Sequence, residues 1–201
     1  MQDGGIFKIE LQKLYSIIHS FSHSLTHSLI QSFFHSKLNH SNLKILLTGA
    51  NNAKALKLIK AFPNHFILLA DYGDVPVITT GNYAFSSIGV LNKESIAHIL
   101  LNYYITEAVD SIIPLHQFEV EPLARAGVLF EEYGIQVLTP PADKIVDFLY
   151  PDKNTFQNFA VFIKGECVFA SSNDIFIKHD EEFNGVFGYN LPTDELKLFT
   201  I

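Results

Sequence analysis

The fold class of this chain follows from one segment, Lys44-Ile45-Leu46-Leu47-Thr48-Gly49-Ala50-Asn51-Asn52. It begins as an apolar run and ends as a polar turn with a single glycine. Apolar side chains then recur at helical spacing, at Ala55, Leu56, Leu58, Ile59 and Phe62, until Pro63-Asn64 stops the pattern. A strand, a tight turn and an amphipathic helix in this order are typical of α/β proteins. The sequence therefore predicts a strand at 44–48 that is followed directly by a helix.

The same alternation continues as far as Pro141. Further strands are predicted at His65–Ala70, Ser111–Leu115 and Ile135–Leu138, and helices at Lys93–Thr106, capped by Asn92, and from the loop His116–Glu121 to Tyr133, capped by Gly134. A short strand is also predicted at Val75–Thr79, although Pro76 weakens it, and residues 81–90 are predicted to be irregular. Because strands that alternate with helices form parallel sheets covered on both faces, we expect a three-layer α/β domain over residues 43–141.

The composition excludes some partners. The chain has 201 residues, a formal net charge of −7 and no cluster of lysines and arginines, so nucleic acid is not expected. Its one cysteine, Cys167, cannot form an internal disulfide and is predicted to be an apolar strand residue. No apolar run is long enough for a signal peptide or a membrane span, so we expect no membrane partner and a cytoplasmic location.

Residues 1–42 form a separate segment of low complexity. Serine recurs every four residues from Ser16 to Ser36, and histidine stands at positions 19, 23, 27 and 35. On a helix these histidines would form a stripe, but no cysteine or carboxylate accompanies them, so no metal site is predicted. A tandem DNA repeat would encode such a tetrad. We therefore expect a His/Ser-rich extension, helical or disordered, that is mis-assigned or recently acquired upstream of a product starting near Leu43.

Residues 142–201 are predicted to form a short helix and a β-hairpin extension. The strands of the hairpin are Phe159–Ile163 and Cys167–Ala170, joined by Lys164-Gly165-Glu166. The side chains of Phe159 and Phe162 either cover the sheet or form the face of a homodimer, and the sequence leaves both interpretations open.

Four pieces of the chain carry a family resemblance. They are Ile45-Leu46-Leu47-Thr48-Gly49-Ala50, the pair Ala70-Asp71, Val109-Asp110-Ser111-Ile112-Ile113-Pro114, and Leu129-Phe130-Glu131-Glu132-Tyr133-Gly134-Ile135-Gln136-Val137-Leu138-Thr139-Pro140. This region resembles the amino-terminal, Rossmann-like pre-ATP-grasp domain of carbamoyl-phosphate-synthase-like ATP-grasp ligases.

The resemblance implies a function divided between two modules. In that family this domain helps to bind a carboxylate or amine substrate, whereas ATP and magnesium occupy a separate, larger module. Sixty residues follow Pro141, too few for that module, so ATP and Mg²⁺ are expected only if a partner chain supplies it. The segment Glu182-Phe183-Asn184 is similar to the family's magnesium pair and is attributed to chance. The resemblance thus implies a substrate-binding relative of ATP-grasp ligases without a complete catalytic module, and whether it is an enzyme stays open.

The candidate ligand-binding residues stand where predicted strands end, because open parallel sheets bind ligands beyond the carboxyl ends of their strands. The rule selects Gly49, Ala50, Asn51 and Asn52 after the first strand, Asp71 and Tyr72 after the second, and His116 and Glu119 after Leu115. His116 is suited to general acid–base chemistry, with Glu119 or Glu121 to orient it. In the alternative interpretation, these glutamates merely favour the start of a helix. No catalytic residue is assigned.

Two other functions stay open. A non-catalytic small-molecule binding or interaction protein would keep only the scaffold. A small NAD(P)-dependent, epimerase-like protein is suggested by Asp71, which stands where dinucleotide folds place their ribose-binding acid. Against this, the turn after the first strand has one glycine of the fingerprint, and no lysine follows Tyr103 or Tyr104 at the spacing of short-chain enzymes.

Overall fold

The described part of the chain contains a parallel and an antiparallel sheet. A computed structural model describes residues 42–149, 156–172, 179–190 and 195–201. Contacts along the Cα trace divide the chain into two units, residues 1–41 and 42–201, and the described residues all belong to the second. The prediction of a His/Ser-rich extension therefore concerns a segment outside the described residues.

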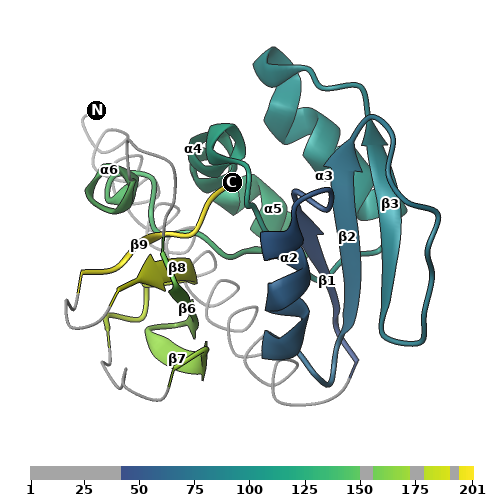
Figure 1. Ribbon diagram of the computed structural model, residues 1–201. Coiled ribbons are helices and arrows are strands. Elements are labelled where there is room, and N and C mark those ends of the chain that lie inside the picture. The colour runs from purple at the N-terminus through teal and green to yellow at the C-terminus, as the bar shows by residue number, and fades with distance from the viewer. Residues whose placement is uncertain (1–41, 150–155, 173–178, 191–194) are drawn as a thin grey trace, which may run out of the picture. The chain divides into compact units, whose positions relative to one another are not determined.

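The parallel sheet has five strands in the order β3-β2-β1-β4-β5 (Figure 1). They are β1 (Lys44–Thr48), β2 (Phe66–Tyr72), β3 (Tyr83–Gly89), β4 (Ser111–Ile113) and β5 (Gln136–Val137). From β1 the chain adds β2 and β3 on one side, and then returns to add β4 and β5 on the other. The order therefore reverses between β1 and β4, and the carboxyl ends of these strands form the edge where such sheets bind ligands.

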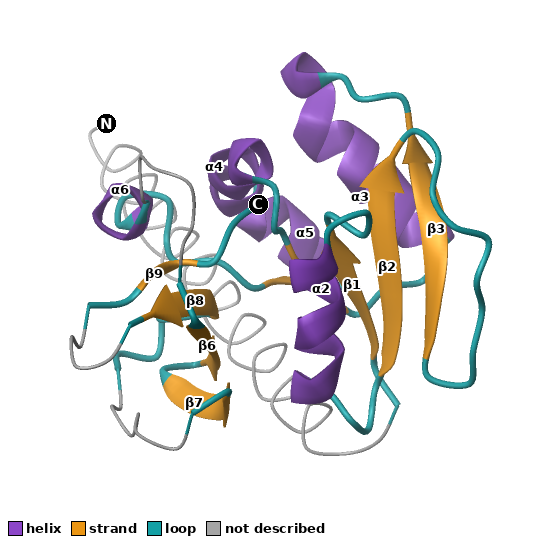
Figure 2. Ribbon diagram, viewed as in Figure 1, coloured by secondary structure: helices purple, strands orange, loops and turns teal. Residues whose placement is uncertain are grey.

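Helices lie on both faces of this sheet (Figure 2). In that view α2 (Ala53–Leu58) lies on the nearer face and α3 (Ile96–Thr106) on the farther one. On the α3 face, side chains from three strands form one core with α3, α4 (Gln117–Arg125) and α5 (Gly127–Glu132): Leu46, Leu68, Ala70, Ile112, Leu100, Tyr104, Leu123 and Phe130. Leu68 and Ala70 are two positions apart on β2, as residues on one face of a sheet must be. The predicted α/β class with a parallel sheet is confirmed.

The third strand does not lie where the sequence predicts it. The prediction of a strand at Val75–Thr79 is wrong, and β3 falls in the region predicted to be irregular. The connection runs back along the outer edge of β3, where Thr79 bridges Ala84 and the Phe85 N–H donates to the Ile78 carbonyl at 2.9 Å. Pro76 has no N–H, so this segment cannot continue the ladder. The connection covers part of an edge that would otherwise be open to pairing with another chain.

The single helix predicted as far as Tyr133 is also wrong, because α4 and α5 are separate helices. Ala126 ends α4 with φ −90° and ψ 4°, and Gly127, a poor helix former, follows it. The predicted C-cap is correct: Gly134 has φ +75°, and the Ile135 N–H donates to the Phe130 carbonyl at 3.0 Å.

The antiparallel sheet has four strands in the order β7-β6-β8-β9. They are β6 (Asn158–Ile163), β7 (Glu166–Ala170), β8 (Gly185–Tyr189) and β9 (Lys197–Leu198), and the short helix α6 (Ile145–Phe148) precedes them. The predicted hairpin is confirmed as β6–β7. Its turn residues Lys164 and Gly165 have φ of +50° and +73°, as a two-residue hairpin of type I′ requires. The sequence does not predict β8 and β9.

The antiparallel sheet has its own core, rich in aromatic side chains. Phe162, Phe183, Phe187 and Tyr189 pack there with Val120 of α4. Since Leu123 of the same helix belongs to the core of the parallel sheet, α4 contributes to both cores. Phe162 is fully buried and Phe159 is 7% exposed, so these side chains cover the sheet within the chain itself.

Replacing Gly165 with alanine is expected to destabilise the protein much more than the same change at Gly73. The two glycines have φ of +73° and +72°, so both substitutions carry a left-handed strain of about 1–2 kcal/mol. A Cβ on Gly165 would also overlap the carbonyl oxygens of His179 and Asp180, whereas nothing lies within 4 Å of a Cβ on Gly73. We expect Gly165→Ala to lose about 2 kcal/mol more in urea unfolding. Equal losses would contradict the packing of residues 179 and 180 on this turn.

Candidate functional site

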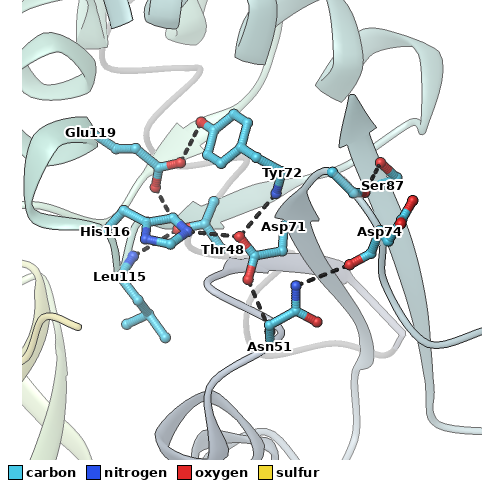
Figure 3. A network of polar contacts seen from close by, with 10 residues as sticks. Thr48, Asn51, Asp71, Tyr72, Asp74, Ser87, Leu115, His116 and Glu119 are labelled. Carbon is cyan, nitrogen blue, oxygen red and sulfur yellow. Dashed lines mark hydrogen bonds and ion pairs between the residues drawn. The ribbon is translucent and has the colours of Figure 1, made fainter. Parts of the chain in front are cut away.

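A buried carboxyl group, Glu119, joins the ends of the central strands at the carboxyl edge of the sheet (Figure 3). The Thr48 hydroxyl at the end of β1 donates to Oε2 at 2.5 Å, and the Tyr72 hydroxyl at the end of β2 donates to Oε1 at 2.5 Å. The Leu115 N–H donates to Thr48 Oγ1 at 2.8 Å, so the proton of Thr48 is directed to Glu119. Glu119 has no exposed surface. One carboxyl group therefore ties β1, β2 and the turn after β4 together.

The positions of Thr48, Tyr72 and Glu119 within their strands and helix direct their side chains to one place. Thr48 lies two positions after Leu46 on β1, and Tyr72 lies two positions after Ala70 on β2. All four side chains therefore point to the face of the sheet that α3 and α4 cover. Glu119 lies in the first turn of α4, where a carboxylate also interacts favourably with the helix dipole. The ends of two strands and the start of one helix thus converge on one acid.

Burial changes the acidity of these groups. It raises the pKa of Glu119, and the hydroxyl hydrogen bonds from Thr48 and Tyr72 oppose that rise only in part. Burial and the neighbouring Glu119 carboxylate raise the pKa of Tyr72 far above its ordinary range. Tyr72 therefore keeps its proton and acts as a donor. The fully buried Tyr104, in the core beneath, has a raised pKa for the same main reason.

Asp71 and His116 form a second pair at the same edge. His116 Nε2 lies 2.9 Å from Asp71 Oδ1, and the two side chains are 18% and 9% exposed. The backbone N–H of Asn51 donates to Asp71 Oδ2 at 2.9 Å, and that of Tyr72 donates to Oδ1 at 2.9 Å. The carboxylate that orients His116 is thus Asp71, 45 positions away in sequence.

This contact corrects the expectation that a glutamate at the helix start orients His116. Glu119 accepts hydrogen bonds from the hydroxyls of Thr48 and Tyr72, and Glu121 pairs with Arg125 at 2.7 Å on the surface. The value of Glu119 to the site is therefore structural: it fixes the turn on which His116 stands.

Aromatic rings hold the His116 ring in place. Phe118 stacks on it with 4.9 Å between ring centroids and 19° between planes, and Tyr72 lies at 5.6 Å. The ammonium group of Lys93 lies 4.8 Å from the centroid of Phe118. The site thus combines a held imidazole with one nearby cation at its rim.

The backbone amides of the turn after β1 donate hydrogen bonds to acceptors within the chain. Ala50 N–H donates to the Ala70 carbonyl at 3.1 Å, Asn51 N–H to Asp71, and Asn52 N–H to the Gly49 carbonyl at 3.0 Å. The Asn52 side chain caps α2 by accepting from Lys54 N–H at 3.0 Å. A pyrophosphate site needs such amides directed outward to the ligand. The geometry therefore disfavours a dinucleotide here.

The side chain of the C-terminal residue, Ile201, packs against Gly49. Gly49 has φ +77°, and the side chain of Ile201 lies so close that a Cβ on Gly49 would overlap it. The Ile201 N–H donates to the Leu115 carbonyl at 2.8 Å. Of the residues that the sequence selects, the structure brings together Asn51, Asp71, Tyr72, His116 and Glu119, and places Gly49, Ala50 and Asn52 in the supporting turn.

Three members of the site are not selected from the sequence, namely Thr48, Lys93 and Phe118. Thr48 carries the only usable signal, a hydroxyl residue that closes an otherwise apolar strand. Lys93, in the turn that precedes α3, and Phe118, in α4, come together only through tertiary packing.

Comparison with known proteins gives no family for the chain: no protein-family model and no curated protein sequence matches it. Within the described ranges, no group of three or more His, Cys, Asp and Glu side chains is placed to hold a metal ion. The two residues similar to the family's magnesium pair bond within the chain. Glu182 accepts from Lys144 Nζ at 3.1 Å, and the Asn184 side chain accepts from the Lys164 N–H at 2.7 Å. The helices of the described part are all too short or too polar to cross a membrane.

The raised pKa of Glu119 predicts a specific dependence of stability on pH. The native state holds this proton more tightly than the unfolded chain, where the pKa is near 4.5. Stability from this group is present below that value and is lost as the pH rises through the native pKa. Glu119→Gln cannot titrate, so its unfolding free energy should improve relative to wild type as the pH rises above 4.5. A constant difference in urea unfolding at several pH values would contradict the buried carboxyl.

Proposed function

We propose that this chain is a substrate-binding relative of the ATP-grasp ligases. In this proposal, residues 43–141 form a Rossmann-like pre-ATP-grasp domain, and a small molecule binds at the carboxyl edge of β1, β2 and β4. The chemistry with ATP and Mg²⁺ takes place on a partner chain that carries an ATP-grasp module. The Asp71–His116 pair at the reversal of strand order is the observation that carries the proposal.

The polar groups at this edge favour a ligand site over a bare scaffold. A scaffold would be most stable with apolar or freely solvated residues at strand ends, since burial of ionisable groups costs free energy. Here Asp71 is 7% exposed and Glu119 fully buried. Ionisable groups that are held in this way at a sheet edge are typical of functional sites. His116 keeps part of its ring exposed, so a ligand can reach it.

The hydrogen bonds at this edge favour a substrate site over an NAD(P) site. A dinucleotide would need outward amides after β1 and an Asp71 carboxylate open to a ribose. The amides of Ala50, Asn51 and Asn52 are engaged within the chain, and the Asp71 carboxylate already accepts from Asn51, Tyr72 and His116. We therefore favour a substrate site over an NAD(P) site.

A thermal-shift screen with amino acids, small carboxylates, ATP–Mg²⁺ and NAD(P) tests the proposal. A ligand at about a hundred times its Kd adds about 2.7 kcal/mol to native stability, which raises Tm by about 5–10 °C in a domain of this size. We expect such a shift with at least one amino acid or carboxylate. Asp71→Asn should reduce it, because the amide cannot hold His116 as the carboxylate does.

The matched control is Asp143→Asn, an exposed aspartate outside the site, which should leave the shift unchanged. A shift with NAD(P) alone would instead support the epimerase-like alternative. No shift with any of these compounds would favour the interaction protein and contradict the proposal.

A further inference from the structure

The edge strand β3 receives a helix on one face of the parallel sheet only. Ala84 and Ile88 pack against the core that α3 covers. Tyr83 and Phe85 alternate with them and therefore lie on the opposite face, where their rings meet edge to face at 6.2 Å between centroids. The connection from β2 to β3, residues 73–82, contains no helix and so adds none to that face. Parallel strands are ordinarily covered on both faces, so the cover of β3 is incomplete.

The chain around this edge exposes large apolar side chains. Val77 and Ile78, in the connection that runs beside β3 (Figure 1), are 103% and 44% exposed. Val90 and Leu91, directly after β3, are 88% and 38% exposed. No residue from 75 to 92 is buried, whereas five of the seven residues of β2 are. Single exposed valines need no explanation, but several large apolar side chains along one sheet edge are typical of an interaction surface.

The backbone of the same edge is directed outward. The Ile78 carbonyl and the Thr80 N–H bond to β3, at 2.9 and 2.8 Å. In an antiparallel pair the direction of these groups alternates along the chain, so the N–H and carbonyl of Thr79 point away from the sheet. Pro76 has no N–H and limits this outer edge to a few residues. Side chains must therefore provide most of any contact made there.

The absence of charge indicates a second copy of the chain as the partner. Residues 75–92 contain no Asp, Glu, Lys, Arg or His, although 17% of the chain is charged and its formal net charge is −7. Two copies repel each other where their acidic surfaces meet, so they approach most easily through an uncharged edge. Such an edge offers no charge to a partner that is selected by charge. Exposed edge strands usually carry charges, lysine above all, that prevent self-association, and this edge has none.

We propose that two copies of this chain associate edge to edge through residues 75–91, related by a two-fold axis. Such an axis pairs the segment around Thr79 antiparallel with itself and brings Val77 and Val90 of both copies into the interface. Interfaces of standard size use about 20–30 residues on each side, and this segment with its flanking residues is close to that size. The inference does not depend on the proposed function, because these side chains do not belong to the Asp71–His116 site.

Sedimentation of the full chain at concentrations up to about 100 µM tests the proposal, because dimer formation follows mass action. The wild type should approach twice the chain mass of 22.6 kDa. Val77→Glu combined with Val90→Glu places like charges on both sides of the two-fold axis and should weaken association at least about a hundredfold. The matched control is Val128→Glu combined with Val146→Glu, at valines of α5 and α6 that are 66% and 76% exposed, and it should associate as the wild type does.

A cross-link locates the contact without relying on a loss of association. In a Cys167→Ser background, which has no other cysteine, Val77→Cys should form a covalent dimer with a short bis-maleimide, and Val128→Cys should not. A wild type that sediments as a monomer at every concentration would overturn the inference. A dimer that persists in the Val77→Glu, Val90→Glu variant, or that does not cross-link through Val77→Cys, would overturn it as well.

Discussion

Glu119→Ala is expected to lower the free energy of unfolding by about 3 kcal/mol. The side chain is fully buried and accepts hydrogen bonds from the hydroxyls of Thr48 and Tyr72. Its removal leaves two hydroxyl donors without their acceptor, and an unsatisfied buried donor costs about 1–3 kcal/mol. Part of the loss will be recovered if water enters the space. The measurement is urea unfolding of wild type and variant under the same conditions.

Two further variants show how much of that loss comes from the buried hydrogen bonds of Glu119. Glu119→Gln keeps the volume and one acceptor oxygen, and should lose about 1 kcal/mol. Glu132→Gln changes an exposed glutamate at the end of α5 and should be within about 0.5 kcal/mol of wild type. If Glu119→Ala were as stable as Glu132→Gln, then Glu119 would not join the three strand ends and would not fix the turn on which His116 stands.

The second large effect is expected at Phe187, in the antiparallel sheet. Phe187→Ala should destabilise the protein by about 4 kcal/mol, because a fully buried ring is replaced by a cavity. The ring stacks on Phe183, with 4.2 Å between centroids, and meets Phe148 and Phe162 edge to face at 5.4 and 5.8 Å. Such aromatic pairs add to the stability that comes from burial alone.

Phe187→Leu is the matched variant, and it should lose about 1–2 kcal/mol because it fills much of the same volume. Val168→Ala on β7, where the side chain is half exposed, should have little effect. Urea unfolding of all three variants also tests whether the two sheets unfold together. A small loss for Phe187→Ala would contradict the aromatic packing of this core. A separate early transition would contradict the shared packing of α4 between the two cores.

Much of the parallel sheet can be predicted from the sequence. The boundaries of the strands β1, β2, β4 and β5 lie within two residues of the predicted ranges, because each is a short apolar run that ends in a turn signal. The rule that ligands bind at carboxyl ends then selects Asp71, Tyr72, His116 and Glu119, which the structure brings to one edge. Local pattern and general topology are sufficient for this much.

The parts that the sequence does not predict depend on contacts between distant residues. Thr48 and Glu119 are 71 positions apart, and nothing near either residue indicates the bond between them. The strand β3 has the mixed sequence Tyr83–Gly89, which becomes a strand because it pairs with β2. The strand β8, with two glycines among its five residues, has weak strand propensity and is held by pairing with β6 on one side and β9 on the other.

Amide chemical-shift mapping of the ¹⁵N-labelled protein with the tightest ligand from the thermal-shift screen tests most directly whether the carboxyl edge is a ligand site. The perturbed amides should cluster at the carboxyl edge, around Asn51, Tyr72, Leu115 and His116, and Asp71→Asn should reduce these perturbations. Perturbations confined to the antiparallel sheet, or equally large in Asp71→Asn, would contradict a ligand site at this edge.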